Sequence, residues 1–146
     1  MFGTKSILLI DGHHEDLWYY AHRLRLASPN SVIFQAATGQ AGLDLCTSHS
    51  IDCVIMEIEL PDMSGFEALA KFASNAEYPQ IPVIMLTRLS NPDLLDLARK
   101  NGAHAGLRKL ATSDDVLNQT ILKLLRPCQR ALPRGKNSCD YRGSDS

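Results

Sequence analysis

Short apolar runs recur along the chain, separated by stretches in which apolar residues follow helical spacing. Four of these runs lie at residues 7–10, 32–36, 53–58 and 81–86. Apolar runs of this length are typical of strands that are buried on both faces, as in parallel sheets. A fifth and weaker run lies at residues 103–107, where Gly106 disfavours a strand interior. The pattern therefore predicts five short strands.

Helical spacing and capping residues predict a helix after each strand. Thr38 is a good N-cap, and Ser64 with Glu67 has the spacing of a capping box. Asn91 is followed by proline and aspartate, which is a strong helix start. The predicted helices cover residues 16–27, a stretch that follows Thr38, residues 64–76, residues 91–101, and a stretch from about 112 to 125.

Five alternations of strand and helix predict an α/β fold with a parallel sheet between two layers of helices. We expect a flavodoxin-like, doubly wound five-stranded sheet, (βα)5, with strand order 2-1-3-4-5. The predicted domain covers residues 1–126. Residues 127–146 have no apolar period, and their four basic and two acidic residues give 4 − 2 = +2. We expect this segment to be a flexible C-terminal tail.

The composition is that of an ordinary globular domain. Of 146 residues, 45% are hydrophobic and 21% are charged, and the net charge is −1. This charge gives no reason to expect binding to nucleic acid or to a membrane surface. The four cysteines lack C-x-x-C or zinc-finger spacing, so we expect buried, reduced thiols. The first apolar run is too short for a signal peptide or a membrane span, which favours a cytoplasmic protein.

Polar side chains stand at the ends of four predicted strands. Asp11 follows the first run, Glu57 lies at the end of the third, Thr87 follows the fourth and Lys109 follows the fifth. In open parallel sheets, ligands bind outside the carboxyl ends of the strands. We therefore expect two acids, a hydroxyl and a lysine to converge at one edge of the sheet.

This order of residues resembles the receiver domain of two-component response regulators. The resemblance rests on residues 7–11, 53–65, 81–87 and 101–109, and covers roughly residues 5–126. In that family a histidine kinase phosphorylates an aspartate four residues before a loop proline, a position held here by Glu57. The resemblance assigns Asp11 to an acidic pocket that helps to hold Mg²⁺. It assigns Thr87 to phosphoryl contact, and Lys109 to the lysine that pairs with the phosphorylated carboxylate.

Four positions depart from the family pattern. Glu57 carries one extra methylene, and group transfer is sensitive to misplacement of about 1 Å. Gly12 replaces one acidic residue of the Mg²⁺ pocket. Leu110 replaces the proline after the lysine, and a cis bond there would cost about 3–4 kcal/mol, so we expect a trans bond. Gly106 stands where the family has its aromatic switch residue.

A magnesium site is therefore expected to be weakened but not abolished. Its candidate ligands are Asp11, Glu57 and Glu59, with Gly12 in place of one ligand. Mg²⁺ usually relies on one or two carboxylates, and these residues could still supply that number. No other cofactor is expected.

Each of these residues also has a structural interpretation. Lys109 can simply form an ion pair with Glu57 or Asp11, and Thr87 can cap backbone groups. His13 and His14 lie close enough to the acids to allow a transition-metal site. Because they are adjacent in sequence, they can equally be exposed residues at a helix start.

Two surfaces are candidates for contact with a partner. Residues 18–20, Trp-Tyr-Tyr, are either packing residues or a docking patch. The resemblance implies a partner face formed by the fourth helix, the fifth strand and the fifth helix. The candidate residues there are Leu94, Leu97, Ala98 and Leu107.

Three functions remain open. The first is an atypical receiver that signals through phosphorylation-independent protein contacts. The second is a working phosphoacceptor that uses Mg²⁺ and a histidine kinase partner. The third is an enzyme or nucleotide binder on the same fold, but the chain has neither a G-x-G-x-x-G nor a P-loop motif. We therefore expect a non-enzymatic module, monomeric or weakly dimeric, whose partner is a histidine kinase or a downstream signalling protein.

Overall fold

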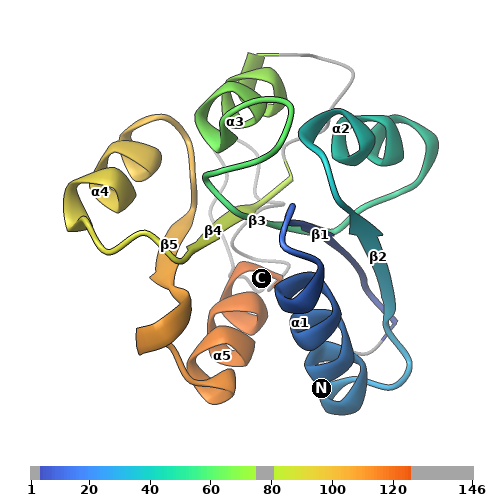
Figure 1. Ribbon diagram of the computed structural model, residues 1–146. Helices are drawn as coiled ribbons and strands as arrows, with labels where there is room; N and C mark the ends of the chain where they lie inside the picture. Colours follow the sequence, from blue (N-terminus) through green and yellow to red (C-terminus); the bar gives the residue numbers. More distant parts are fainter. Residues whose placement is uncertain (1–3, 75–80, 126–146) are drawn as a thin grey trace, which may run out of the picture.

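Five parallel strands form the centre of the molecule (Figure 1). The computed structural model describes residues 4–74 and 81–125. The sheet order is β2-β1-β3-β4-β5, and each pair of neighbours is parallel. The predicted fold class and strand order are therefore confirmed. The strands are β1 (Ser6–Ile10), β2 (Val32–Ala36), β3 (Cys53–Met56), β4 (Val83–Thr87) and β5 (Ala105–Arg108).

Helices cover both faces of this sheet (Figure 1). One face packs against α1 and α5, through a core cluster that includes Leu24 and Ile121. The other face packs against α2, α3 and α4, through a second cluster that includes Leu43, Leu69 and Leu95. The helices are α1 (His14–Ala27), α2 (Gly39–Ser48), α3 (Gly65–Ser74), α4 (Pro92–Lys100) and α5 (Asp114–Leu124), with a short 3₁₀ helix, η1 (Lys109–Ala111).

Side-chain caps fix the starts of most helices. The Thr38 hydroxyl accepts the Ala41 N–H at 3.0 Å, and the Ser113 hydroxyl accepts the Val116 N–H at 3.2 Å. Ser64 and Asn91 cap α3 and α4 in the same way. These bonds satisfy N–H groups that have no partner within the helix. By contrast, α1 has His13 at its N-cap with no side-chain cap and starts two residues earlier than predicted.

Strand boundaries shift by one or two residues from the predicted runs. β3 ends at Met56, so Glu57 and Ile58 belong to the following loop. β4 extends to Thr87, which is fully buried. β5 begins at Ala105 instead of residue 103. These shifts place Glu57 and Thr87 at neighbouring strand ends.

Gly106 allows α4 to lie close to the sheet. A Cβ atom at this position would stand 3.0 Å from Leu95 Cδ2 and 3.1 Å from Leu95 Cβ. The Leu95 side chain therefore covers the space next to β5. The guanidinium of Arg99 also donates to the Gly106 carbonyl at 3.4 Å, which ties the same helix to the same strand.

The predicted partner face is only partly exposed. Leu97 is 46% exposed, whereas Leu94 and Leu107 are partly buried. Ala98, on the inner side of α4, is fully buried in the core, so its side chain is not exposed at this face. A small apolar residue on the inner side of a helix packs against the sheet and is not available at the surface.

The outer strand β2 is held by a side chain from α1. The Arg25 guanidinium donates to the Ile33 carbonyl at 3.1 Å. Because β2 lies at the edge of the sheet, one of its backbone groups is thereby covered.

Cys46 and Cys53 are confirmed as buried thiols that form no disulfide. Burial raises the pKa of the Cys46 thiol to about 11, which keeps it protonated at neutral pH. Cys128 and Cys139, and the predicted tail at 127–146, lie outside the described residues. Within residues 4–74 and 81–125, no helix is long and apolar enough to cross a membrane.

Candidate functional site at the carboxyl ends of the strands

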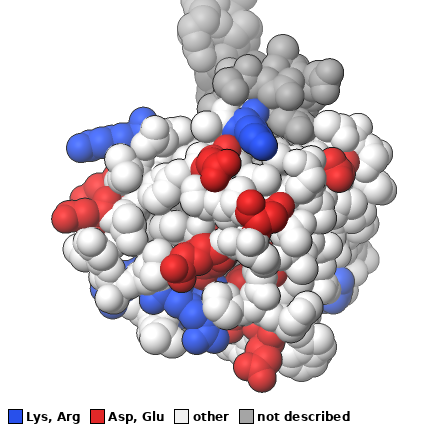
Figure 2. Space-filling model, turned by 45° about the horizontal axis from the view of Figure 1, so that its top comes forward, with Lys and Arg blue, Asp and Glu red and all other residues white. Residues whose placement is uncertain are grey.

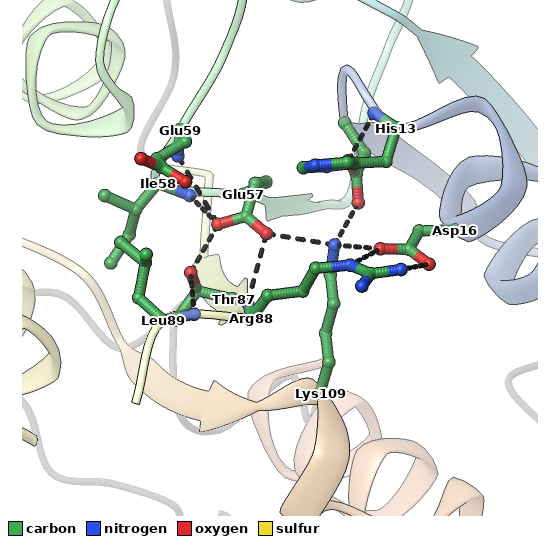
Figure 3. A network of polar contacts seen from close by, with 10 residues as sticks. His13, Asp16, Glu57, Ile58, Glu59, Thr87, Arg88, Leu89 and Lys109 are labelled. Atoms are coloured by element: carbon green, nitrogen blue, oxygen red, sulfur yellow. Dashed lines mark hydrogen bonds and ion pairs between the residues drawn. The ribbon is translucent and has the colours of Figure 1, made fainter. Parts of the chain in front are cut away.

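The Glu57 carboxylate is the centre of a polar cluster at the strand ends (Figure 3). Its Oε2 atom accepts the Thr87 hydroxyl, and also accepts the N–H groups of Ile58 at 2.7 Å and Glu59 at 3.4 Å. Its Oε1 atom accepts the Arg88 N–H at 3.2 Å. Glu57 is only 2% exposed. Both carboxylate oxygens are therefore occupied by donors from the protein.

Lys109 joins three carboxylates. Its Nζ atom lies 2.6 Å from Asp11 Oδ2, 2.8 Å from Asp16 Oδ2 and 2.9 Å from Glu57 Oε1. The lysine side chain is 3% exposed. An ammonium group has three N–H donors, so each of them has a carboxylate acceptor. Residues from three distant parts of the sequence thus form one buried ionic network.

Two members of the network, Asp16 and Arg88, were not among the predicted site residues. Arg88 Nε lies 2.6 Å from Asp16 Oδ2, and Arg88 Nη2 lies 2.8 Å from Asp16 Oδ1. This two-point pairing is the strongest geometry for an arginine and a carboxylate. Only weak sequence signals pointed to these two residues. Asp16 lies in the first turn after Asp11, and Arg88 directly follows Thr87.

The network sets the charge state of its members. Burial would raise the pKa of Glu57, but hydrogen bonds from Thr87 and Lys109 outweigh it and hold that pKa below its usual value. Burial would lower the pKa of Lys109, and its three carboxylate partners instead raise it. The pKa of Asp16 is lowered, chiefly by its hydrogen bond from Arg88. All three groups are therefore charged at neutral pH.

Asp11, His13 and Asp16 bring possible metal-ligand atoms within 4.8 Å of one another. His13 Nδ1 lies 3.2 Å from Asp11 Oδ1, and the His13 N–H donates to the same oxygen at 2.9 Å. The predicted ligand Glu59 is exposed and contributes only its N–H to the cluster.

The three carboxylates leave no place for a magnesium ion among them while Lys109 is bound to them. The carboxylates of Asp11, Asp16 and Glu57 converge on the Lys109 ammonium, which stands where a cation would be bound. Mg²⁺ needs oxygen ligands in near-octahedral order at about 2.0–2.1 Å, so the ammonium and the ion cannot share this place.

Packing accounts for Gly12, whereas Leu110 lies at the surface. A Cβ atom at Gly12 would stand 2.7 Å from Pro61 Cδ, so a second acidic residue would require this loop to move. No peptide bond in the described part of the chain is cis, as expected for the bond before Leu110. Leu110 itself is 88% exposed.

A surface pocket of about 240 Å³ adjoins the network between α1 and the segment after β5. Trp18 and Tyr19 are exposed, whereas Tyr20 is buried, so the aromatic triplet has both inward and outward side chains. The pocket is lined by Asp16, Tyr19, Tyr20, Arg88, Lys109, Leu110, Thr112 and Asp114.

A five-stranded parallel sheet with acids, a hydroxyl and a lysine at its carboxyl edge defines a flavodoxin-like domain with a polar strand-end site. The family described as the response regulator receiver domain matches residues 7–121. The chain therefore belongs to the receiver domain family of two-component signalling. Receiver domains are signalling modules that interact with histidine kinases or other signalling proteins, and they typically bind Mg²⁺ in an acidic pocket.

Individual relatives agree with this assignment. The transcriptional regulatory protein PdtaR of Mycobacterium tuberculosis is 33% identical over 95 residues, which are 65% of this chain and 45% of that protein. A probable cyclic di-GMP phosphodiesterase of Vibrio cholerae is 31% identical over 98 residues, 67% of this chain and 22% of that protein. The chain thus spans less than half the length of these relatives.

Solved structures agree on the fold. The receiver domain protein of Clostridium thermocellum is 29% identical in sequence, with a TM-score of 0.71. The match covers 83% of this chain and 94% of that one.

Proposed function

We propose that the chain is an atypical receiver that signals by protein contact and needs no phosphorylation, with Glu57 as a fixed negative charge at the phosphoacceptor position. The observation that supports this best is the occupancy of the Glu57 carboxylate. Five donors reach its two oxygens, from Thr87, Lys109 and three backbone N–H groups. The glutamate itself thus uses the donors that would otherwise receive an anionic group at this position.

The same contacts disfavour phosphoryl acceptance. To accept a phosphoryl group, a carboxylate oxygen must attack phosphorus with a free lone pair. Here Oε1 is paired with Lys109, and Oε2 accepts the Thr87 hydroxyl. Pairing with the lysine also lowers the pKa of Glu57 and so weakens it as a nucleophile. The carboxylate carries less charge than a phosphoryl group, but it is fully hydrogen-bonded.

The proposal has further parts, which the composition of the chain and its family favour. The module is cytoplasmic and non-enzymatic, and it is a monomer or a weak homodimer with no nucleic acid or membrane partner. Its partner is a histidine kinase or a downstream signalling protein. The partner contacts the face of α4, β5 and α5, where Leu97 is the most exposed of the apolar candidates. Charges of both signs are interspersed on the face in Figure 2, which favours a protein partner over a polyanion.

The test is incubation with acetyl phosphate and Mg²⁺, followed by intact mass measurement. We expect no adduct of about 80 Da, the mass added by one phosphoryl group. A receiver domain with aspartate at the corresponding position, treated in parallel, provides the positive control. A stoichiometric adduct on the unaltered chain that is absent from Glu57→Gln would overturn the proposal.

A further inference from the structure

Arg88 makes a contact that the proposed function does not use. It directly follows β4, and its side chain reaches Asp16 in the first turn of α1 (Figure 3). In the sheet, β3 lies between β1 and β4. A link from the end of β4 to the helix after β1 therefore crosses the end of β3, where Glu57 stands.

Exposure falls from the outside of this link to the inside. The Arg88 side chain is 49% exposed and that of Asp16 is 14% exposed. The side chains of Lys109 and Glu57, which lie behind them, are 3% and 1% exposed. The guanidinium is thus the solvent-facing layer of the network, and the two central charges are covered.

The link also holds Asp16 on the lysine. Asp16 Oδ2 accepts from Arg88 Nε at 2.6 Å and from Lys109 Nζ at 2.8 Å. Asp16 Oδ1 accepts from Arg88 Nη2. With both of its oxygens held, Asp16 must break one of these contacts before it can turn toward an incoming cation or release Lys109. Mg²⁺ is bound through one or two carboxylates, whose oxygens must be available to it.

We propose that the Arg88–Asp16 ion pair is a closing contact that excludes Mg²⁺ and small phosphodonors from the strand-end site, independently of the residue at position 57. This inference rests on the proposed function and deepens it, because it names what keeps the site closed. Arg88 acts on the site through Asp16 and Lys109, so it is a positioning residue.

If the Arg88–Asp16 pair closes the site, an aspartate at position 57 is not sufficient for phosphorylation. In Glu57→Asp, phosphorylation would require an aspartate oxygen to attack the phosphorus of acetyl phosphate. One P–O bond would form to the aspartate, and the P–O bond to acetate would break and release acetate. We expect this variant to gain little adduct, because Arg88 and Asp16 still cover the site.

The decisive comparison is between Glu57→Asp and the double variant Glu57→Asp with Arg88→Ala. We expect at least about a tenfold higher initial rate of adduct formation in the double variant, in the range by which positioning alters group transfer. Arg99→Ala, added to Glu57→Asp, is the matched control. Arg99 is an equally exposed arginine that pairs with Asp96 on α4. It should leave the rate unchanged.

Equal rates in Glu57→Asp and the Arg88→Ala double variant would overturn the inference, and so would an absence of adduct in both. An adduct on the unaltered chain would instead overturn the proposed function, so the two failures are distinguishable.

Titration of Arg88→Ala with Mg²⁺ alone, followed by calorimetry, is a second measurement that does not require Glu57→Asp. We expect Mg²⁺ to bind Arg88→Ala at least about threefold more tightly than it binds the unaltered chain or Arg99→Ala. The reason is that the lost guanidinium is a positive charge that competes with Mg²⁺ for Asp16. Unchanged Mg²⁺ affinity would also contradict the inference.

Discussion

At the scale of single residues, the Glu57 carboxylate is buried and fully paired. The carboxylate lies among Thr87, Lys109 and three backbone N–H groups. A buried charge is tolerated only when it is paired and hydrogen-bonded, and removing one partner of such a pair costs about 3–5 kcal/mol. Glu57 and Lys109 therefore depend on each other for stability, whatever their role in signalling.

This dependence predicts how stability varies with pH. The folded pKa of Glu57 lies below its usual 4.5, so the unfolded chain binds more protons there as the pH falls. Its contribution is present above about pH 4.5 and is lost as the pH drops through the folded pKa. The pKa of Lys109 is raised above 10.5, so its contribution is present below that pH and is lost in stronger alkali. Urea unfolding at a series of pH values measures both limits.

Glu57→Gln tests how much Glu57 contributes to the loss of stability at acid pH. We expect the slope of unfolding free energy against pH between about pH 5 and 3 to become shallower by up to about 1.4 kcal/mol per pH unit, the value for one proton. An identical slope in the two proteins would show that the Glu57 carboxylate is not stabilised in the folded state.

At the scale of elements, Gly106 sets how closely α4 approaches β5. Gly106→Phe would place a Cβ atom 3.0 Å from Leu95 Cδ2, and the Leu95 Cβ atom is almost as close. Because Cβ atoms move only with the backbone, the helix must shift. We expect a loss of about 1–3 kcal/mol in the free energy of unfolding, typical of an overpacked core. Chemical denaturation measures it.

Leu95→Ala is the partner variant for this experiment. Alone it should destabilise the protein by about 2–5 kcal/mol, as the loss of a buried leucine usually does. Combined with Gly106→Phe it should cost less than the sum, by at least about 0.5 kcal/mol, because the ring occupies the vacated space. Additive effects would contradict direct packing between the two positions.

The sequence predicts the elements well because most boundaries carry a local signal. Thr38, Asn91 and Ser113 cap their helices through side-chain hydrogen bonds a few residues away. The start of α1 at His14 was missed because His13 gives no side-chain cap. The observed strand ends differ from the predicted ones because an apolar run does not show which of its residues pair with a neighbouring strand.

The site could be predicted only in part. Asp11, Glu57, Thr87 and Lys109 each stand at a strand end, and the sheet order alone brings them together. The Arg88–Asp16 pair joins residues that are 72 positions apart, and nothing in its local pattern selects one acid among several. The packing of Pro61 on Gly12 is also a contact between distant loops, so the sequence shows only that a carboxylate is absent there.

At the scale of the whole molecule, the described part of the core forms two clusters, one on each face of the sheet. The last buried residue of these clusters is Leu125, directly after α5. The boundary of the independently stable domain at residue 126 therefore stays a prediction.

This boundary is open to a direct test. A chain that ends at residue 126 should unfold within about 0.5 kcal/mol of the full chain, as expected when no core contact is removed. Thermal and urea denaturation of the two chains measure the difference. A loss of several kcal/mol would mean that residues 127–146 pack against the domain, and the two-part division would then be abandoned.

The Arg25 contact to the Ile33 carbonyl bears on how the molecule behaves at high concentration. An outer strand with free backbone groups can recruit a strand from another molecule and begin an aggregate. In β2 a charged guanidinium, fixed from the neighbouring helix, already occupies one of these groups. Any strand approaching from another copy would have to displace this charge and desolvate it. The contact therefore disfavours edge-to-edge association of sheets from different molecules.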